Sequence, residues 1–139
     1  MQTFMPFADF KKSAKCLDRL RLGKQRVECL QIVKALIGES KGWTNHPATK
    51  MWKENIPALC SYWQAIIDEW TSRGYVDNTH KELARLIDEY GIDKMDSSMP
   101  SWFGNEKFHL SHKSNLLRKN REHYIQYFNV SPELEYIWP

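Results

Sequence analysis

The sequence predicts an all-α protein that folds as a single compact domain. Apolar side chains recur every three or four residues along most of the 139-residue chain, as they do on one face of a helix. Capping residues, prolines and glycines divide these stretches where helices begin and end. No segment has the alternation of a half-buried strand, and there is no internal repeat. A chain of this length suits one core, so we assign residues 1–139 to one helical domain with long loops.

Start and stop residues place the helices of the first half. Asp9 is suited to cap a short helix that starts at residue 10. A second helix is expected from about Leu20 to Ile37, where Gly38 stops it. Pro47 suits the first turn of a third helix, and Pro57 must kink that helix or split it in two.

The second half continues in the same way. After Pro57, apolar residues at helical spacing predict a helix that ends at Arg73–Gly74. These residues are Leu59, Tyr62, Trp63, Ile66 and Trp70. Thr79 and Glu82 have the spacing of a capping box, which opens a helix that ends at Gly91. After a loop, a last helical region is expected from about Glu106 to Phe128, followed by an irregular aromatic tail.

Positive charge is concentrated at the two ends of the chain. Residues 1–53 have a net charge of +7, residues 54–106 of −6 and residues 107–139 of +2, which together give the +3 of the whole chain. Such a division predicts one cationic face, for which nucleic acid is the obvious polyanionic partner. The alternative is a protein whose surface charge is merely uneven.

Composition excludes several other classes of protein. An apolar fraction of 42% and six tryptophans exclude a disordered chain, and no apolar run is long enough to span a bilayer. The first residues lack the order of a signal peptide, so we expect a cytoplasmic protein with access to DNA. Three cysteines without a CxxC pair indicate reduced thiols; they are Cys16, Cys29 and Cys60.

The helix of residues 20–37 has an apolar face and a polar one. At about 100° per residue, the apolar face comprises Leu22, Cys29, Leu30, Val33 and Ile37. The opposite face comprises Arg21, Lys24, Gln25, Glu28 and Gln31. Arg26 falls inside the apolar arc, which predicts a partly buried arginine with a carboxylate or carbonyl partner.

Glu28 is the one acidic residue on this cationic face, and two interpretations compete. It can be a member of an exposed ion pair with Arg21 or Lys24 at the usual helical spacing. Alternatively, the face lies on a phosphate backbone, which repels a carboxylate. A carboxylate at such a place is explained by general acid–base catalysis or by stabilisation of a cationic intermediate.

Two further segments carry candidate binding residues. His46 precedes Pro47 and is either a helix-capping loop residue or part of a site for a phosphate or a flipped nucleotide. Among the tryptophans, Trp63 and Trp70 are expected in the core, whereas Trp102 is the one expected to be exposed.

The last helical region is rich in histidines and cations. His109 and His112 share a face, but no third ligand has the spacing of a metal site, so we expect no metal. A helix that contacts phosphates fits better, because no acidic residue interrupts its cations, which are Lys113, Arg118, Lys119 and Arg121.

Four segments of the chain resemble one protein family. They are "MQTFMPFADFKKSAKCLDRLRLGKQRVECLQIVKAL", "GWTNHPATKMW", "WFGNEKFHLSHKSNLLRK" and the closing "EYIWP". They are similar to a bacterial and phage branch of the pyrimidine-dimer DNA glycosylases of the endonuclease V type. The resemblance implies an all-helical fold that inserts into kinked duplex DNA, recognises cyclobutane pyrimidine dimers and flips out a base opposite the lesion. We expect damaged duplex DNA as the partner, a monomer, and no cofactor.

The resemblance also implies a mechanism. In the family, the amino-terminal α-amine attacks C1′ of the sugar, and the resulting imine allows strand cleavage. An essential glutamate on the first long helix corresponds by position to Glu28. The family's DNA-contacting cations correspond to Arg21, to either Lys24 or Arg26, and in the last helix to Lys113 and Arg118.

Gln2 bears on which residue supplies this amine. The characterised family enzyme begins with a small residue that is exposed when the initiator methionine is removed. Gln2 is bulky and ordinarily leaves Met1 in place, so the nucleophile is expected to be the Met1 amine, or amine catalysis does not occur. An α-amine ordinarily has a pKa of about 7.7–8, so an appreciable fraction is the neutral nucleophile near pH 7. Other functions remain open: a non-catalytic DNA-binding module on this scaffold, or a glycosylase for another modified base.

Overall fold

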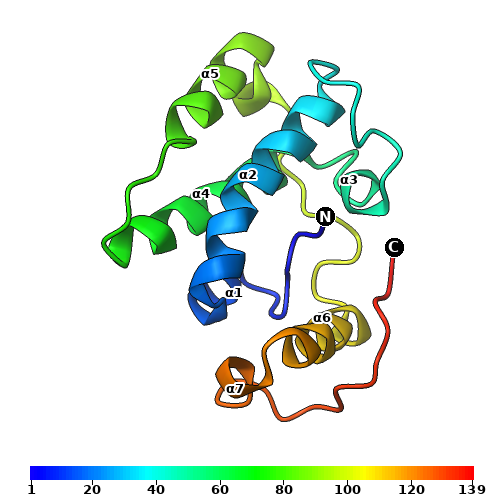
Figure 1. Ribbon diagram of the computed structural model, residues 1–139. Helices are drawn as coiled ribbons and strands as arrows, with labels where there is room; N and C mark the ends of the chain where they lie inside the picture. The colour runs from blue at the N-terminus through cyan, green and yellow to red at the C-terminus, as the bar shows by residue number, and fades with distance from the viewer.

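The structure, a computed structural model, describes all residues 1–139 and confirms the all-α prediction. It contains seven α-helices and a short 3₁₀ helix, and no strand (Figure 1). The elements are α1 (Phe10–Cys16), α2 (Arg19–Leu36), α3 (Pro47–Lys50), α4 (Ile56–Ser72), α5 (His80–Tyr90), η1 (Ile92–Lys94), α6 (Glu106–Lys119) and α7 (Arg121–Tyr124). None of these helices is long and apolar enough to cross a membrane.

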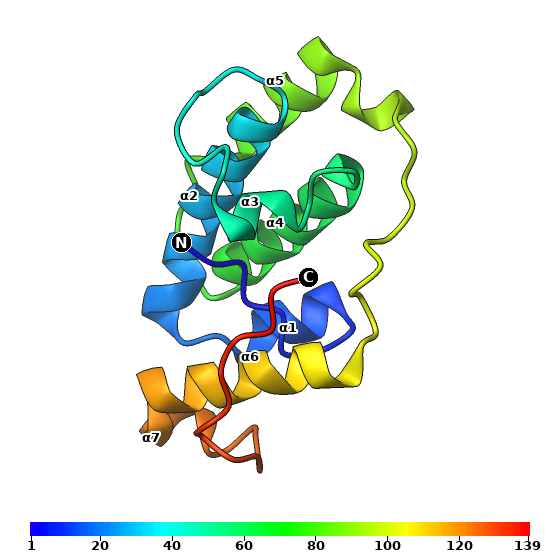
Figure 2. The same ribbon diagram turned by 90° about the vertical axis from the view of Figure 1, so that its right-hand side faces the viewer.

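Helix α4 lies at the centre of the core, packed against α1 and α2. Its buried side chains include Leu59, Tyr62, Trp63 and Ile66, which are 0% exposed. Helix α5 lies at one end of the molecule and α6 and α7 lie at the other, with α2 and α4 between them (Figures 1 and 2). Because α2 and α4 form the middle layer, one face of α2 is left to be covered by segments without regular structure.

The extended amino-terminal segment, residues 1–6, covers that face. The backbone N–H of Phe4 donates to Gln25 on α2 at 3.0 Å, and the carbonyl of Phe4 accepts from the hydroxyl of Tyr62 on α4 at 2.6 Å. One residue later, the N–H of Met5 donates to Nδ1 of His112 on α6 at 3.0 Å. Three helices therefore hold the first residues of the chain, and residues 2–5 are all buried.

Most predicted helix boundaries are confirmed, and each has a local cause. The side chain of Asp9 accepts a bond from the Lys12 N–H at 2.9 Å and caps α1. Gly38 adopts a left-handed φ of +84° just after α2, and Gly91 one of +63° at the end of α5. Pro57 lies in the first turn of α4, so the predicted helix is split and not kinked.

Three local predictions are wrong. The last helical region is not continuous, because Asn120 has a non-helical backbone and caps a separate short helix, α7. The side chain of Thr79 makes no capping bond. Instead, Asp77 accepts from the N–H groups of Thr79 and His80 at 3.0 and 2.7 Å. Trp102 is 5% exposed and donates its indole N–H to the carbonyl of Met51, so it belongs to the core.

The prediction for Arg26 is confirmed. Its guanidinium lies 2.9 Å from the carboxylate of Asp77 and stacks over the ring of Trp70, 4.4 Å from the centroid. The three cysteines are buried and unpaired, as expected. Gln25 lies on the predicted polar face of α2, next to Glu28, but it is 0% exposed because the amino-terminal segment covers this part of the face.

Candidate active site

The two predicted catalytic residues, Met1 and Glu28, line one cavity of about 340 Å³. Its walls come from the amino-terminal segment, α2, the end of α6 and the carboxy-terminal tail. The lining residues are Met1, Gln2, Phe4, Arg21, Lys24, Gln25, Glu28, Lys119 and Tyr136. Three of the predicted DNA-contacting cations, Arg21, Lys24 and Lys119, therefore line this cavity together with Glu28, the only carboxylate in its wall.

Glu28 is held by N–H donors and not by an ion pair. Its Oε2 atom accepts from the amide of Gln25 at 2.8 Å and from the backbone N–H of Gln2 at 3.4 Å. Burial raises the pKa of the Glu28 carboxyl above its ordinary value, while the Gln2 N–H, the positive amino terminus and Lys24 act in the opposite direction. A carboxyl with a raised pKa, next to the amino terminus, is suited to exchange a proton with the neighbouring amine.

The exposed ion pair predicted as the alternative for Glu28 is not formed. Arg21 instead lies 3.3 Å from the carboxylate of Asp18, the residue before α2. Asp18 in turn accepts a hydrogen bond from the hydroxyl of Tyr124 on α7. Burial pushes the pKa of Asp18 up, but the Tyr124 hydroxyl and Arg21 outweigh it and hold this pKa below its ordinary value. Asp18 therefore stays ionised and fixes Arg21 at the edge of the cavity.

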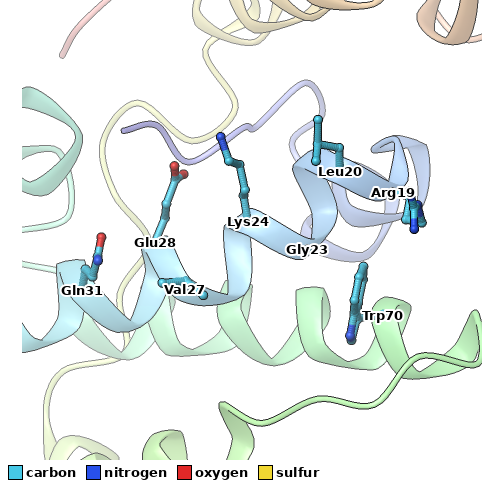
Figure 3. A pocket seen from close by; sticks show the side chains of 8 residues that line it. All are labelled: Arg19, Leu20, Gly23, Lys24, Val27, Glu28, Gln31 and Trp70. Carbon is cyan, nitrogen blue, oxygen red and sulfur yellow. The ribbon is translucent and has the colours of Figure 1, made fainter.

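A second cavity, of about 530 Å³, lies against the same stretch of α2 (Figure 3). Lys24 and Glu28 line both cavities, and in Figure 3 their side chains point to the same side of α2. The lining residues are Arg19, Leu20, Gly23, Lys24, Val27, Glu28, Gln31 and Trp70. A Cβ atom on Gly23 would come within 3.0 Å of the Trp70 ring, so the glycine lets this ring pack closely against α2. The second cavity is therefore lined by apolar side chains and by the carboxylate of Glu28.

The structure confirms His46 as a helix-capping residue. Its Nδ1 accepts from the N–H of Ala48 at 3.0 Å, at the start of α3. Its ring lies edge-on to Trp43 and to Trp138, with centroids 5.5 and 6.3 Å away. Burial, and then the positive charge of the amino terminus, lower the pKa of His46. The histidine is therefore close enough to the amine to sense its charge, and it is mainly neutral at pH 7.

The cations of the last helix do not form one cluster. Lys119 lines the cavity with Met1 and Glu28. Lys113 lies over the ring of Phe7, 4.7 Å from its centroid. Arg118 donates to the carbonyls of Pro132 and Leu134 and so holds the tail along α6. Of the last-helix cations, only Lys119 is at the site, and Arg118 acts on the tail that forms part of its wall.

The two histidines of α6 hold the amino-terminal segment. His112 accepts from the Met5 N–H, and Nδ1 of His109 is 2.8 Å from the carbonyl of the same residue. Burial lowers the pKa of His112 to about 3, so its ring is neutral and free to accept. No group of three metal-ligating side chains is brought together in the structure.

Sequence reasoning missed two residues of the site, Gln25 and Tyr136. The hydroxyl of Tyr136 is buried and unpaired, and burial raises its pKa to about 12. Tyr136 is in an irregular tail, where no periodicity predicts its neighbours. The one available signal for Gln25 was its place three residues before Glu28, on the same face of the helix.

Comparison with known proteins identifies a relationship for most of the chain. The model of a family described as pyrimidine dimer DNA glycosylase matches residues 1–83. The match contains the amino-terminal segment and helices α1 to α4, and hence Met1 and Glu28, but neither α6 nor the tail. Searches of curated proteins and of solved structures gave no significant match.

Proposed function

Because this chain belongs to the pyrimidine dimer DNA glycosylase family, we propose that it releases a base of a pyrimidine dimer in duplex DNA and then cleaves the strand through an imine on its amino terminus. The observation that carries this proposal is the cavity shared by Met1 and Glu28, in which the Gln2 nitrogen is 3.4 Å from the Glu28 carboxylate. An amine and a carboxylate are the two groups that imine chemistry needs.

The proposed reaction begins with the neutral amine of Met1. The lone pair of its nitrogen forms a bond to C1′ as the bond from C1′ to the base breaks, and the base leaves with the electrons of that broken bond and takes up a proton from water. Glu28 accepts the proton that the amine nitrogen releases and passes it to the ring oxygen of the sugar as the ring opens. The carboxylate restored in this way stabilises the positive imine. Loss of a proton from C2′ then expels the 3′ phosphate. The sequence of steps uses no metal and no redox cofactor.

The surroundings of the cavity support DNA as the substrate. Lys24 and Lys119 line it and form no ion pair, which leaves their ammonium groups available to phosphates. The second cavity is large enough for an unstacked nucleotide, with Leu20 and Val27 exposed at 63% and 44%. Extrusion of a nucleotide costs a few kcal/mol, and least where the base is damaged and weakly paired, which is one source of lesion selectivity.

Incubation with duplex DNA in the presence of borohydride tests the proposal. UV-irradiated duplex is expected to give a covalent adduct of protein and DNA, and the same duplex without irradiation none. Tight binding without an adduct would instead support a binding module, or a glycosylase that uses water. An adduct formed only on a duplex with another modified base would keep the amine chemistry and reassign the lesion.

A further inference from the structure

We infer that Gln25 is a positioning residue of the reaction: its buried amide ties the amino-terminal segment and the Glu28 carboxylate to a single nitrogen atom. The inference rests on the function proposed above. Gln25 lies on α2, one helical turn before Glu28, and is 0% exposed. Its role is to set where the amine and the carboxylate stand relative to each other.

All the polar atoms of this side chain are used. Its Nε2 donates to the carbonyl of Gln2 at 2.7 Å and to Oε2 of Glu28 at 2.8 Å. Its Oε1 accepts from the backbone N–H of Phe4 at 3.0 Å and lies 2.8 Å from the hydroxyl of Tyr62, which shares its hydrogen with the Phe4 carbonyl. Because every donor and acceptor of this buried amide is hydrogen-bonded, any displacement of the side chain would break at least one of these bonds.

The orientation of the amide is also determined. Glutamine amides can often be turned over without loss of bonds. Here the backbone removes that freedom, because the N–H of Phe4 can only donate and the carbonyl of Gln2 can only accept. The NH₂ group therefore always faces Glu28, and it holds the ionised carboxylate, which is the form that stabilises a positive imine.

The bond to Glu28 distinguishes this arrangement from a purely structural one. Three of the four contacts would suffice to hold the amino-terminal segment against α2 and α4. The fourth connects that segment to the carboxylate, and at 2.8 Å it is shorter than the 3.4 Å bond from the Gln2 nitrogen. Gln25 thus fixes Glu28 more firmly than the peptide next to the amine does.

Several charged or ionisable groups face Glu28, and their charges must be held constant in a test of this role. They are the amino terminus, Arg21 and Lys24 of α2, Lys119 of α6 and Tyr136 of the tail, together with the buried Cys29 and Tyr62. Tyr62 is neutral, because burial raises the pKa of its hydroxyl. Gln25→Met leaves all of them in place. Methionine has a similar length and no branch, so it can fill the same space without forming the four bonds.

The experiment compares Gln25→Met with a matched control, Tyr62→Phe, in the full chain. Tyr62→Phe removes a bond from the same buried network but leaves the bond to Glu28 intact. Single-turnover cleavage is measured on a duplex with one pyrimidine dimer. The Glu28 carboxyl is titrated by carbon NMR and identified by the resonance that Glu28→Gln lacks.

Gln25→Met is expected to cleave at least about tenfold more slowly with unchanged affinity for DNA, the effect of losing a hydrogen bond to a charged group. Its Glu28 midpoint moves to higher pH, because an N–H donor to the ionised form is gone. Tyr62→Phe lowers the melting temperature without moving the midpoint. A parent rate in Gln25→Met, or an equal loss in both variants with an unmoved midpoint, overturns the inference.

Two further variants make the test decisive. If Gln25→Met does not fold, Gln25→Glu keeps the acceptor for Phe4 but places a second carboxyl beside Glu28, and the two carboxyls then share a proton; cleavage with the rate and the pH dependence of the parent would overturn the inference here too. Glu28→Gln separates the inference from the proposed function. Cleavage by Glu28→Gln at the parent rate refutes the role of the carboxylate itself, whereas an inactive Glu28→Gln beside a fully active Gln25→Met refutes only the role of Gln25.

Discussion

Glu28 stands at the end of a basic stretch of sequence because the amino terminus of the chain lies beside it. The carboxylate accepts from Gln25 and Gln2, feels the positive charge of the Met1 amine, and lines both cavities on α2. Neither of the cations predicted to pair with it does so, because Arg21 pairs with Asp18 and Lys24 forms no ion pair. A single residue thus faces the amino terminus on one side and the second cavity on the other.

Replacement of Glu28 tests its chemistry with little change in shape. Glu28→Gln is expected to keep the fold and to bind damaged duplex at least as tightly, because a charge that repels phosphate has been removed. Strand cleavage should fall by about 10²-fold or more, the usual contribution of a positioned acid–base group. Gel-based cleavage and binding assays on the same duplex measure both quantities. Cleavage at the parent rate would show that Glu28 has no part in the reaction.

The amino terminus supports a second prediction at this scale. Intact-mass measurement is expected to show a retained Met1, since the next residue is the bulky Gln2. Acetylation of that amine should abolish borohydride trapping and leave DNA binding nearly unchanged, because one charge among many is lost. Lys24 is the nearest competitor as nucleophile. Trapping that survives acetylation and disappears in Lys24→Ala would move the reaction to α2.

At the scale of elements, the ends of α2 and α6 bring positive charge to the cavity, and the other helices hold them there. Helix α7 acts through Tyr124 and Asp18 to fix Arg21, and Arg118 of α6 holds the tail that carries Tyr136. On the far side, α5 is tied to the end of α2 by ion pairs of Arg85 and Lys34 with acidic side chains. Charge is therefore segregated between the two ends of the molecule: Lys34 and Arg85 are paired with acidic side chains at the α5 end, whereas Lys24 and Lys119 at the cavity form no ion pair.

This segregation predicts which cations contact DNA. Lys24→Ala and Lys119→Ala are each expected to lower the slope of log affinity against log salt by about 0.9, the value for one phosphate contact. Lys81→Ala, an exposed cation of α5 at the opposite end, is the matched control and should leave the slope unchanged. Equal slopes in all three variants would contradict a DNA surface around the cavity. Lys113→Ala in the same series decides whether that surface extends along α6.

At the scale of the whole molecule, His112 links pH to stability. Its pKa in the folded protein is lowered to about 3 by burial, whereas an unfolded histidine has a pKa of about 6.5. The unfolded state therefore binds an extra proton between these two values. The stabilisation is complete above about pH 6.5 and is lost as the pH falls toward 3, by at most about 1.4 kcal/mol per pH unit.

Urea unfolding between pH 7 and pH 4 measures this effect. His112→Asn removes the titrating group, and its side-chain oxygen can still accept from the Met5 N–H. The variant is expected to be less stable at pH 7 but to lose less free energy of unfolding on acidification than the parent. Parallel pH curves for the two proteins would show that another group, such as the nearby His109, dominates the acid response.

The sequence was sufficient for most of the helices and for placing Met1 and Glu28 among the candidate residues that the structure brings to one cavity, and insufficient for what surrounds them. Caps and stops such as Asp9 and Gly38 act within a few residues, so they can be recognised locally. Gln25 could not, since its burial depends on an extended segment that covers a polar helix face, and extended segments have no periodic signal. Trp102 was misjudged because its burial depends on a distant part of the chain: its indole N–H donates to the carbonyl of Met51, 51 residues away.

The bond between Met5 and His112 spans 107 positions of the chain and has a consequence for how the protein is made. During synthesis the amino-terminal segment leaves the ribosome first, but its partners on α2, α4 and α6 follow one after another, and α6 comes last. The bonds from α2 and α4 can form early, but those from α6 cannot form until nearly all of these residues have been translated. The amino terminus is the first part of the molecule to be made, and the cavity around Met1 and Glu28 is completed only when the end of α6 and Tyr136 of the tail have joined it.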